Sequence, residues 1–199
     1  MRWGSEIADV LVRVSGVLES LTPAQWESQS LCEAWRVRDV AGHIVWRLGS
    51  SPGEMLRDVG SAYRAGNSLN PMVAFDRVSV ATAQAEPADL VRRIRRIAAI
   101  KLGGTGRTGV SELAEALVHG YDITAALGIP IEVEPRVSEA VARSRLPLLP
   151  LTTRSVLSRR SLVATDAAWR VGSGPAIPGT AAAIVLYLYG RRPLAATLH

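Results

Sequence analysis

The sequence predicts a mainly α-helical protein, a four-helix bundle followed by a small α+β region. Apolar residues recur at helical spacing through the first two-thirds of the 199 residues. Proline, glycine and capping residues separate these segments at short intervals. Short strand-like segments occur only after Pro150. We therefore expect a helical bundle domain over residues 1–150 and a short α+β region over residues 151–199.

The helical segments follow one another with short or moderate links. In the first segment, Ile7, Val10, Leu11, Val14 and Leu18 form an apolar stripe on one face. The expected helices are residues 5–20, a short turn opened by Thr22-Pro23, residues 36–49, residues 53–65, a helix from Asn70-Pro71 to 85, residues 87–102, and a helix capped by Ser111 that ends before Gly128. Long antiparallel helices with such links are typical of a bundle.

The pattern changes in the last fifty residues. Residues 161–166 and 168–172 are predicted to be two short strands joined by a tight turn. Gly179-Thr180 then begins an apolar helix that stops at Gly190. A region of this size is too small to fold alone, so we expect it to dock on the bundle or to pair with other strands.

Composition excludes several classes of function. The net charge is +5, but the basic residues are almost all arginine, and their one dense cluster, at residues 92–96, fits a solvated helix face. No zinc-finger spacing or basic-region heptad accompanies it, so we expect no nucleic-acid partner. The longest apolar stretch is far shorter than the ~20 residues that span a bilayer. The sequence begins without an export-signal pattern and contains one cysteine, Cys32, which favours the cytoplasm.

Three other motifs give weaker signals. The glycine-rich loop at residues 103–109 resembles a phosphate cradle, but it lacks the lysine and follows no strand, so we interpret it as a flexible connection. Cys32 has no histidine near it in sequence and is interpreted as a small buried hydrophobic residue. No nucleophile-elbow sequence supports a Ser-His-Asp triad.

Two histidines and one glutamate are the strongest candidates for a functional site. Glu115 and His119 are four residues apart in a predicted helix, so their side chains lie one turn apart on one face. His43 lies on another predicted helix, and the third histidine, His199, is the last residue. Two imidazoles and a carboxylate form the ligand set of a catalytic zinc site with one open position. Spacing alone leaves a second interpretation open, in which all three are ordinary polar residues.

Two aspartates are placed to contact these imidazoles. Asp39 lies one turn before His43, and Asp122 follows His119 by three residues. Metal-bound imidazoles usually donate their other N–H group to an acceptor. We therefore predict Asp39 and Asp122 as the hydrogen-bond partners of the two ligands.

Three sequence blocks resemble one known family. They are LCEAWRVRDVAGH at residues 31–43, EALVHGYDI at residues 115–123, and VATDAAWRVGSGP at residues 163–175 followed by LYGR at 188–191. In this order they resemble the mycothiol-dependent maleylpyruvate isomerase family, within the DinB superfamily of metal-binding four-helix bundles. The resemblance covers nearly the whole chain, although the helices between the blocks carry little signal.

The resemblance implies a site and a reaction. It implies that His43, Glu115 and His119 bind zinc or another divalent ion, and that Arg191 reaches towards the active site as a catalytic residue that neutralises an anion. The C-terminal region is short for this family, which implies fewer substrate contacts or contacts from a partner subunit. As a monomer or homodimer, the protein would bind a low-molecular-weight thiol, by analogy mycothiol, together with a small-molecule substrate.

The expected reaction follows from these elements. The metal-bound thiol would attack, as thiolate, an electrophilic carbon of a small anionic substrate, giving isomerisation or S-transfer. Two alternatives remain open. One is a metal-dependent hydrolase with a zinc-bound hydroxide, which needs the same ligands, and the other is a non-catalytic metal- or ligand-binding module.

Overall fold

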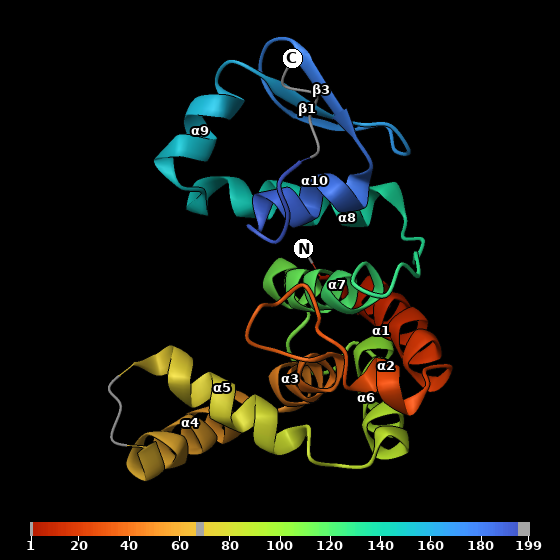
Figure 1. Cartoon of the computed structure of the whole chain (residues 1–199), viewed down its shortest axis with the longest axis vertical. Helices are drawn as coiled ribbons and strands as arrows, with labels where there is room; N and C mark the ends of the chain where they lie inside the picture. The colour runs from red at the N-terminus through yellow and green to blue at the C-terminus, as the bar shows by residue number, and fades with distance from the viewer. Residues whose placement is uncertain (1, 67–69, 195–199) are drawn as a thin grey trace. The chain divides into compact units, whose positions relative to one another are not determined.

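A computed structural model describes residues 2–66 and 70–194, and it has the mainly α-helical fold with a small sheet that the sequence predicts. The chain forms two compact units, Arg2–Ile131 and Glu132–His199 (Figure 1). The sequence-based boundary after Pro150 therefore falls inside the second unit. His199 lies outside the described residues.

The first unit consists entirely of helices and the loops between them, within the part of the chain that is described. In chain order they are α1 (Gly4–Glu19), α2 (Pro23–Trp26), α3 (Val37–Gly49), α4 (Pro52–Gly66), α5 (Pro71–Thr82), α6 (Pro87–Leu102) and α7 (Val110–Thr124). The short α2 begins with the predicted cap, because the side chain of Thr22 accepts from the N–H group of Gln25.

Four of these helices form the bundle. Helix α1 packs against α6 and α7, and α3 packs against the same two helices, which closes a four-helix ring. Fully buried side chains from each helix fill its centre, among them Leu11, Ile44, Ile94 and Leu117. Helices α4 and α5 pack against each other, and α5 lies along α3 (Figure 1). The predicted bundle is thus confirmed, with α4 and α5 as an addition beside α3.

One local prediction for the first unit is wrong. Helix α7 begins at Val110, so Ser111 lies inside its first turn instead of capping it. The amide of Gly109 instead donates to the carboxylate of Glu112, at 3.1 Å. The glycine-rich loop before α7 is anchored near its end, because the buried ammonium group of Lys101 donates to the carbonyl of Arg107 at 2.8 Å. Its flexibility stays a prediction.

The second unit combines helices with a small sheet. Its elements are α8 (Pro135–Arg145), the 3₁₀ turn η1 (Leu146–Leu148), α9 (Leu151–Leu157), β1 (Ser161–Ala164), β2 (Arg170–Gly172), β3 (Ala176–Gly179) and α10 (Ala181–Leu188). Helix α8 packs against α10 and β2, and α10 contacts β1. The unit therefore covers its strands with its own helices.

The sheet contains one strand that the sequence pattern did not predict. Strand β1 lies in the centre, antiparallel to β2 and parallel to β3. Leu162 pairs with Val171 on one side and with Ile177 on the other. Strand β3 contains Pro178 and ends at Gly179, two residues that weaken any strand signal but are tolerated at a sheet edge.

None of the helices in the described ranges is both long enough and apolar enough to cross a membrane.

We predict that Gly42 is required for the contact between α3 and α5. A Cβ atom at this position would lie 2.7 Å from the backbone carbonyl oxygen of Ser79 and 2.8 Å from the Cβ atom of Ala83. Gly42→Ala should therefore lower the free energy of unfolding by about 1–3 kcal/mol, measured by urea denaturation. Gly16→Ala is the matched control: its Cβ meets no atom within 4 Å, and it should raise stability by about 0.5–1 kcal/mol. Equal stability of Gly42→Ala and the parent would contradict the prediction.

Candidate metal centre

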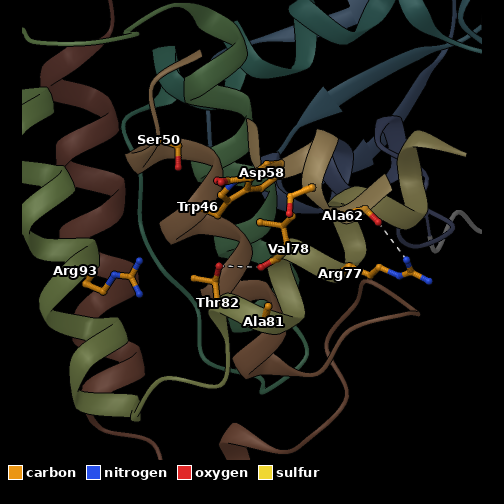
Figure 2. Close-up of a pocket in the computed structure, with 10 residues that line it drawn as sticks. Trp46, Ser50, Asp58, Ala62, Arg77, Val78, Ala81, Thr82 and Arg93 are labelled. Carbon is orange, nitrogen blue, oxygen red and sulfur yellow. Dashed lines mark hydrogen bonds between the residues drawn. The ribbon is translucent and has the colours of Figure 1, made fainter. Parts of the chain in front are cut away.

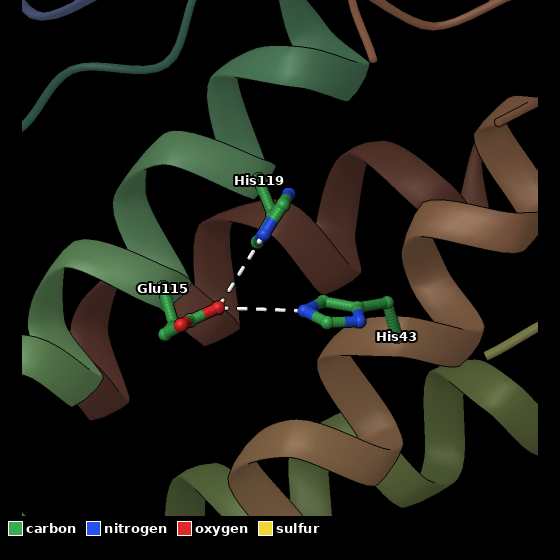
Figure 3. A group of neighbouring side chains, drawn as sticks. All are labelled: His43, Glu115 and His119. Atoms are coloured by element: carbon green, nitrogen blue, oxygen red, sulfur yellow. Dashed lines mark hydrogen bonds and ion pairs between the residues drawn. The ribbon is translucent and has the colours of Figure 1, made fainter. Parts of the chain in front are cut away.

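Three side chains from α3 and α7 converge in the bundle. The Nε2 atoms of His43 and His119 each lie 3.4 Å from the same oxygen, Oε2 of Glu115. One ligand atom from each residue lies within 4.8 Å of the other two (Figure 3). Both histidines are buried, at 8% exposure each. The spacing of Glu115 and His119 places them one turn apart on α7, and the contact between α3 and α7 brings His43 to them.

Hydrogen bonds at the outer nitrogens fix the orientation of both imidazoles. Nδ1 of His43 lies 2.9 Å from Oγ of Ser79, whose own hydroxyl donates to the carbonyl of Phe75 at 2.7 Å. Because that proton is already used, Nδ1 of His43 is the donor, and its Nε2 lone pair faces Glu115. Nδ1 of His119 similarly lies 3.0 Å from Oδ2 of Asp122, which is fully buried. Both histidines thus present Nε2 towards the carboxylate.

An arginine orients the carboxylate from its other side. Nε of Arg47 lies 3.3 Å from Oε1 of Glu115, which leaves Oε2 for the imidazoles. Arg47 follows His43 by four residues and therefore lies on the same face of α3. Arg107 extends this network, with Nη1 3.3 Å from Oε1 of Glu112 and Nη2 donating to the carbonyl of Arg47. The predicted loop thus contributes a cation that binds the end of α3.

The environment shifts the pKa values of all three groups. Burial lowers the pKa of His43 below its ordinary value. Burial would also lower the pKa of His119, but the hydrogen bonds and charges of Asp122 and Glu115 outweigh it and raise that pKa. Burial would raise the pKa of Glu115, but His119, His43 and Arg47 together hold it far below its usual range. Glu115 is therefore a carboxylate at neutral pH.

Aromatic rings enclose the cluster. The ring centroid of Trp35 lies 4.7 Å from that of His43 and 5.9 Å from that of His119. The indole N–H group of Trp35 donates to the carboxylate of Asp76 on α5. Trp46 approaches His43 edge-on, with centroids 6.0 Å apart. These rings cover part of the two imidazoles and lower the dielectric constant beside them, which strengthens their electrostatic interactions, while the side chain of Glu115 stays 27% exposed.

The donor chemistry fits a divalent cation. Two neutral imidazole nitrogens and a carboxylate oxygen are all acceptors, so their convergence needs a proton or a cation between them. No cysteine is among them, and three ligands of this kind match catalytic zinc sites, which leave one position open, better than closed structural sites. His43, Glu115 and His119 are thus the residues that could hold an ion.

Comparison with known proteins identifies the family. Residues 7–124 match the family described as the mycothiol maleylpyruvate isomerase N-terminal domain. This match spans α1 to α7 and includes every residue of the cluster. The chain belongs to this family.

Solved structures agree at the level of the fold. The crystal structure of the mycothiol-dependent maleylpyruvate isomerase superposes with a TM-score of 0.53 at 14% identity, covering 97% of this chain and 90% of that one. A point mutant of that enzyme gives a TM-score of 0.51 at 15% identity, covering 95% and 88%. None of the curated proteins compared matches the chain.

The remaining predicted residues have different surroundings. Asp39 does not contact His43, because it occupies the first turn of α3 and accepts from the backbone amide and the guanidinium group of Arg36 at 3.0 and 2.9 Å. Ser79 instead forms the hydrogen bond to His43 that was predicted for Asp39. Asp122 lies beside His119, where we expected it, and its role next to a metal stays a prediction. Arg191 follows α10 in the second unit, and its catalytic role stays a prediction.

Sequence reasoning missed three residues that surround this cluster. Arg47 could have been found from its spacing of four residues from His43. Ser79 and Trp35 could not, because α5 and the loop before α3 reach the imidazoles only through tertiary packing.

A recess of about 580 Å³ is lined in part by Trp46 (Figure 2). Its other lining residues come from α3 to α6 and include Arg93 and Asp58. Asp58 accepts from the indole N–H group of Trp46 at 3.0 Å. Trp46 thus contacts both the recess and the ring of His43.

We predict that the parent protein binds one Zn²⁺ ion and that His119→Ala does not. Removing Nε2 of His119 leaves two ligands and an open cavity, so affinity should fall at least 100-fold. Competition with a chromophoric chelator measures the dissociation constant, and circular dichroism verifies folding. Glu139→Gln, on the second unit, is the control and should bind as the parent does. Equal, negligible zinc in the parent and His119→Ala would refute the site.

We also predict a pH dependence that Asp122 controls. Both imidazoles must be neutral to bind zinc, so affinity falls as the pH drops through the pKa of His119, which lies above its ordinary value of 6.5. Asp122→Asn removes a charge that raises this pKa, while its amide oxygen still accepts from Nδ1. The fall in zinc affinity should therefore move to lower pH in this variant, as measured by zinc titration between pH 5 and 8. An unchanged profile, or a shift to higher pH, would contradict this assignment.

Proposed function

We propose that this chain is a metal-dependent enzyme that uses a low-molecular-weight thiol, mycothiol or a close analogue, for isomerisation or S-transfer on a small electrophilic anion. The observation that carries the proposal is the convergence of two imidazole nitrogens on one oxygen of Glu115. Membership in the mycothiol maleylpyruvate isomerase N-terminal domain family supports an isomerase-like reaction with a thiol. The fold shared with the mycothiol-dependent maleylpyruvate isomerase is consistent with this reaction.

His43, Glu115 and His119 would hold the ion, and zinc fits this set of nitrogen and oxygen ligands. A cation with an open position supplies one chemical effect, which is to lower the pKa of a thiol that reaches it. The protein's own groups prepare the site for that effect. Ser79 and Asp122 keep both imidazoles in the tautomer whose Nε2 atom is free to bind.

Charge in the site favours an anionic substrate. Arg47 contributes a guanidinium group beside Glu115, and Arg107 adds a second close by. The carboxylates of Glu112 and Glu115 partly neutralise them, and binding of an ion to Glu115 would leave more of the positive charge of Arg47 for a substrate carboxylate. Arg191 is proposed as a further cation for the substrate or the thiol.

The indole ring of Trp35 would exclude water from one side of the site. Trp35 packs on the imidazoles, and its indole N–H group is anchored on Asp76, so the ring stays in place. A fixed apolar wall excludes water from one side of the thiol and of the electrophilic carbon. Exclusion of water disfavours hydrolysis and supports thiol chemistry over the hydrolase alternative.

Turnover assays test this function. The zinc-loaded protein is incubated with maleylpyruvate, with and without mycothiol, and isomerisation is followed by absorbance. We expect turnover that requires the thiol, and a loss of at least 100-fold in kcat/KM for His119→Ala, with Glu139→Gln unaffected. Turnover without any thiol would overturn thiol dependence, and a hydrolysis product in that reaction would favour a hydrolase. Tight zinc binding with no turnover of maleylpyruvate or related electrophiles would favour a non-catalytic module.

A further inference from the structure

The C-terminal unit contains a pocket of its own, formed wholly by residues between 155 and 194. Its volume is about 350 Å³, within the range of small-molecule sites. Four apolar side chains line it, from α9, β1, β3 and the segment after α10: Val156, Leu162, Ile177 and Leu194. Leu162 and Ile177 are neighbours in the parallel pair of strands, so the sheet supplies the apolar floor.

The polar groups of this pocket are all uncommitted donors. They are the side chains of Ser155, Arg159, Arg160 and Tyr187. Within the described part of the chain, the polar atoms of these four side chains form no hydrogen bond or ion pair. Among the described residues, none that lines the pocket carries a carboxylate. The recess beside Trp46 differs in this respect, because Asp58 lies in its wall, and a third pocket contains Glu19 paired with Arg95.

The backbone that carries the two arginines is held in place. Gly172 and Gly174 have φ values of +91° and +100°, and a Cβ atom on either would lie 2.4 Å from the carbonyl oxygen of Arg160 or Arg159, respectively. The amide of Arg160 also donates to the carbonyl of Val156 at 2.8 Å. The backbone at both arginines is therefore held in place beside the pocket, so that ligand binding need not order this turn.

We propose that this pocket binds a small organic acid, with its apolar body on Leu162 and Ile177 and its anionic group on Arg159 and Arg160. An apolar floor alone would accept any small hydrophobic molecule. Two guanidinium groups without an acidic partner select those that carry a carboxylate or a similar anion, which can form paired hydrogen bonds with them. The assignment is independent of the metal centre, since every lining residue belongs to the C-terminal unit.

Three ligands test the apolar floor and the two arginines of the pocket separately. Isothermal titration calorimetry is performed on the full, metal-free chain with octanoate, octan-1-ol and acetate. We expect one octanoate per chain, binding at least ten-fold weaker for the alcohol, and no measurable heat with acetate. Equal affinity for octanoate and octan-1-ol would overturn the proposal, because the arginines would then contribute nothing. Absence of octanoate binding up to millimolar concentration would overturn it as well.

Variants then locate the bound acid. The double variant R159Q/R160Q should weaken octanoate at least ten-fold and leave octan-1-ol unchanged. Ser155→Glu should also weaken octanoate, because it places a carboxylate at an exposed position in the wall. R57Q/R64Q removes two exposed arginines of α4 as the charge-matched control and should bind like the parent. Unchanged octanoate affinity in R159Q/R160Q would refute the site. Loss of octanoate binding in His119→Ala would place the acid at the metal centre and refute it too.

Discussion

The carboxylate of Glu115 lies between two imidazoles and an arginine inside a helical bundle, and much of the first unit is arranged around this contact. Its Oε2 atom faces both Nε2 atoms, while its Oε1 atom faces Arg47. In a partly buried site such a group of acceptors is stable only if positive charge compensates it. Arg47 supplies part of that charge from within the fold, and a proton or a cation must supply the rest.

The surrounding helices provide the geometry that this contact demands. Gly42 lets α3 approach α5 closely enough for Ser79 to reach His43. The loop before α3 brings Trp35 over both imidazoles. Close packing at Gly42 therefore also helps to set which nitrogen of His43 is available. The cluster depends on four segments of the chain, although only two helices carry its three converging side chains.

Local spacing and resemblance predicted the three converging side chains, and tertiary packing decided their partners. Glu115 and His119 share a helix, so a separation of four residues was enough to place them together. His43 lies on another helix, so spacing made it a candidate but could not bring it to the other two, and the resemblance of its sequence block supported the placement. Asp39 has a similar spacing from His43, but the first turn of a helix offers an amide, and Arg36 offers a cation; both compete for its carboxylate. In the C-terminal unit, Pro178 weakens the strand signal of β3, so the sequence pattern did not predict this edge strand, which is defined by its pairing with β1.

His43 and Glu115 are separated by 72 positions in the sequence, yet they belong to one cluster. With Cys32 as its single cysteine, the chain cannot form an internal disulfide. An ion shared by α3 and α7 would act as a removable cross-link between these helices, and it would stabilise the bundle because it binds the folded chain and not the unfolded one. The free energy of metal binding would then add to the free energy of unfolding of the bundle. The concentration of the free ion in the cell would therefore set how much of the chain is folded.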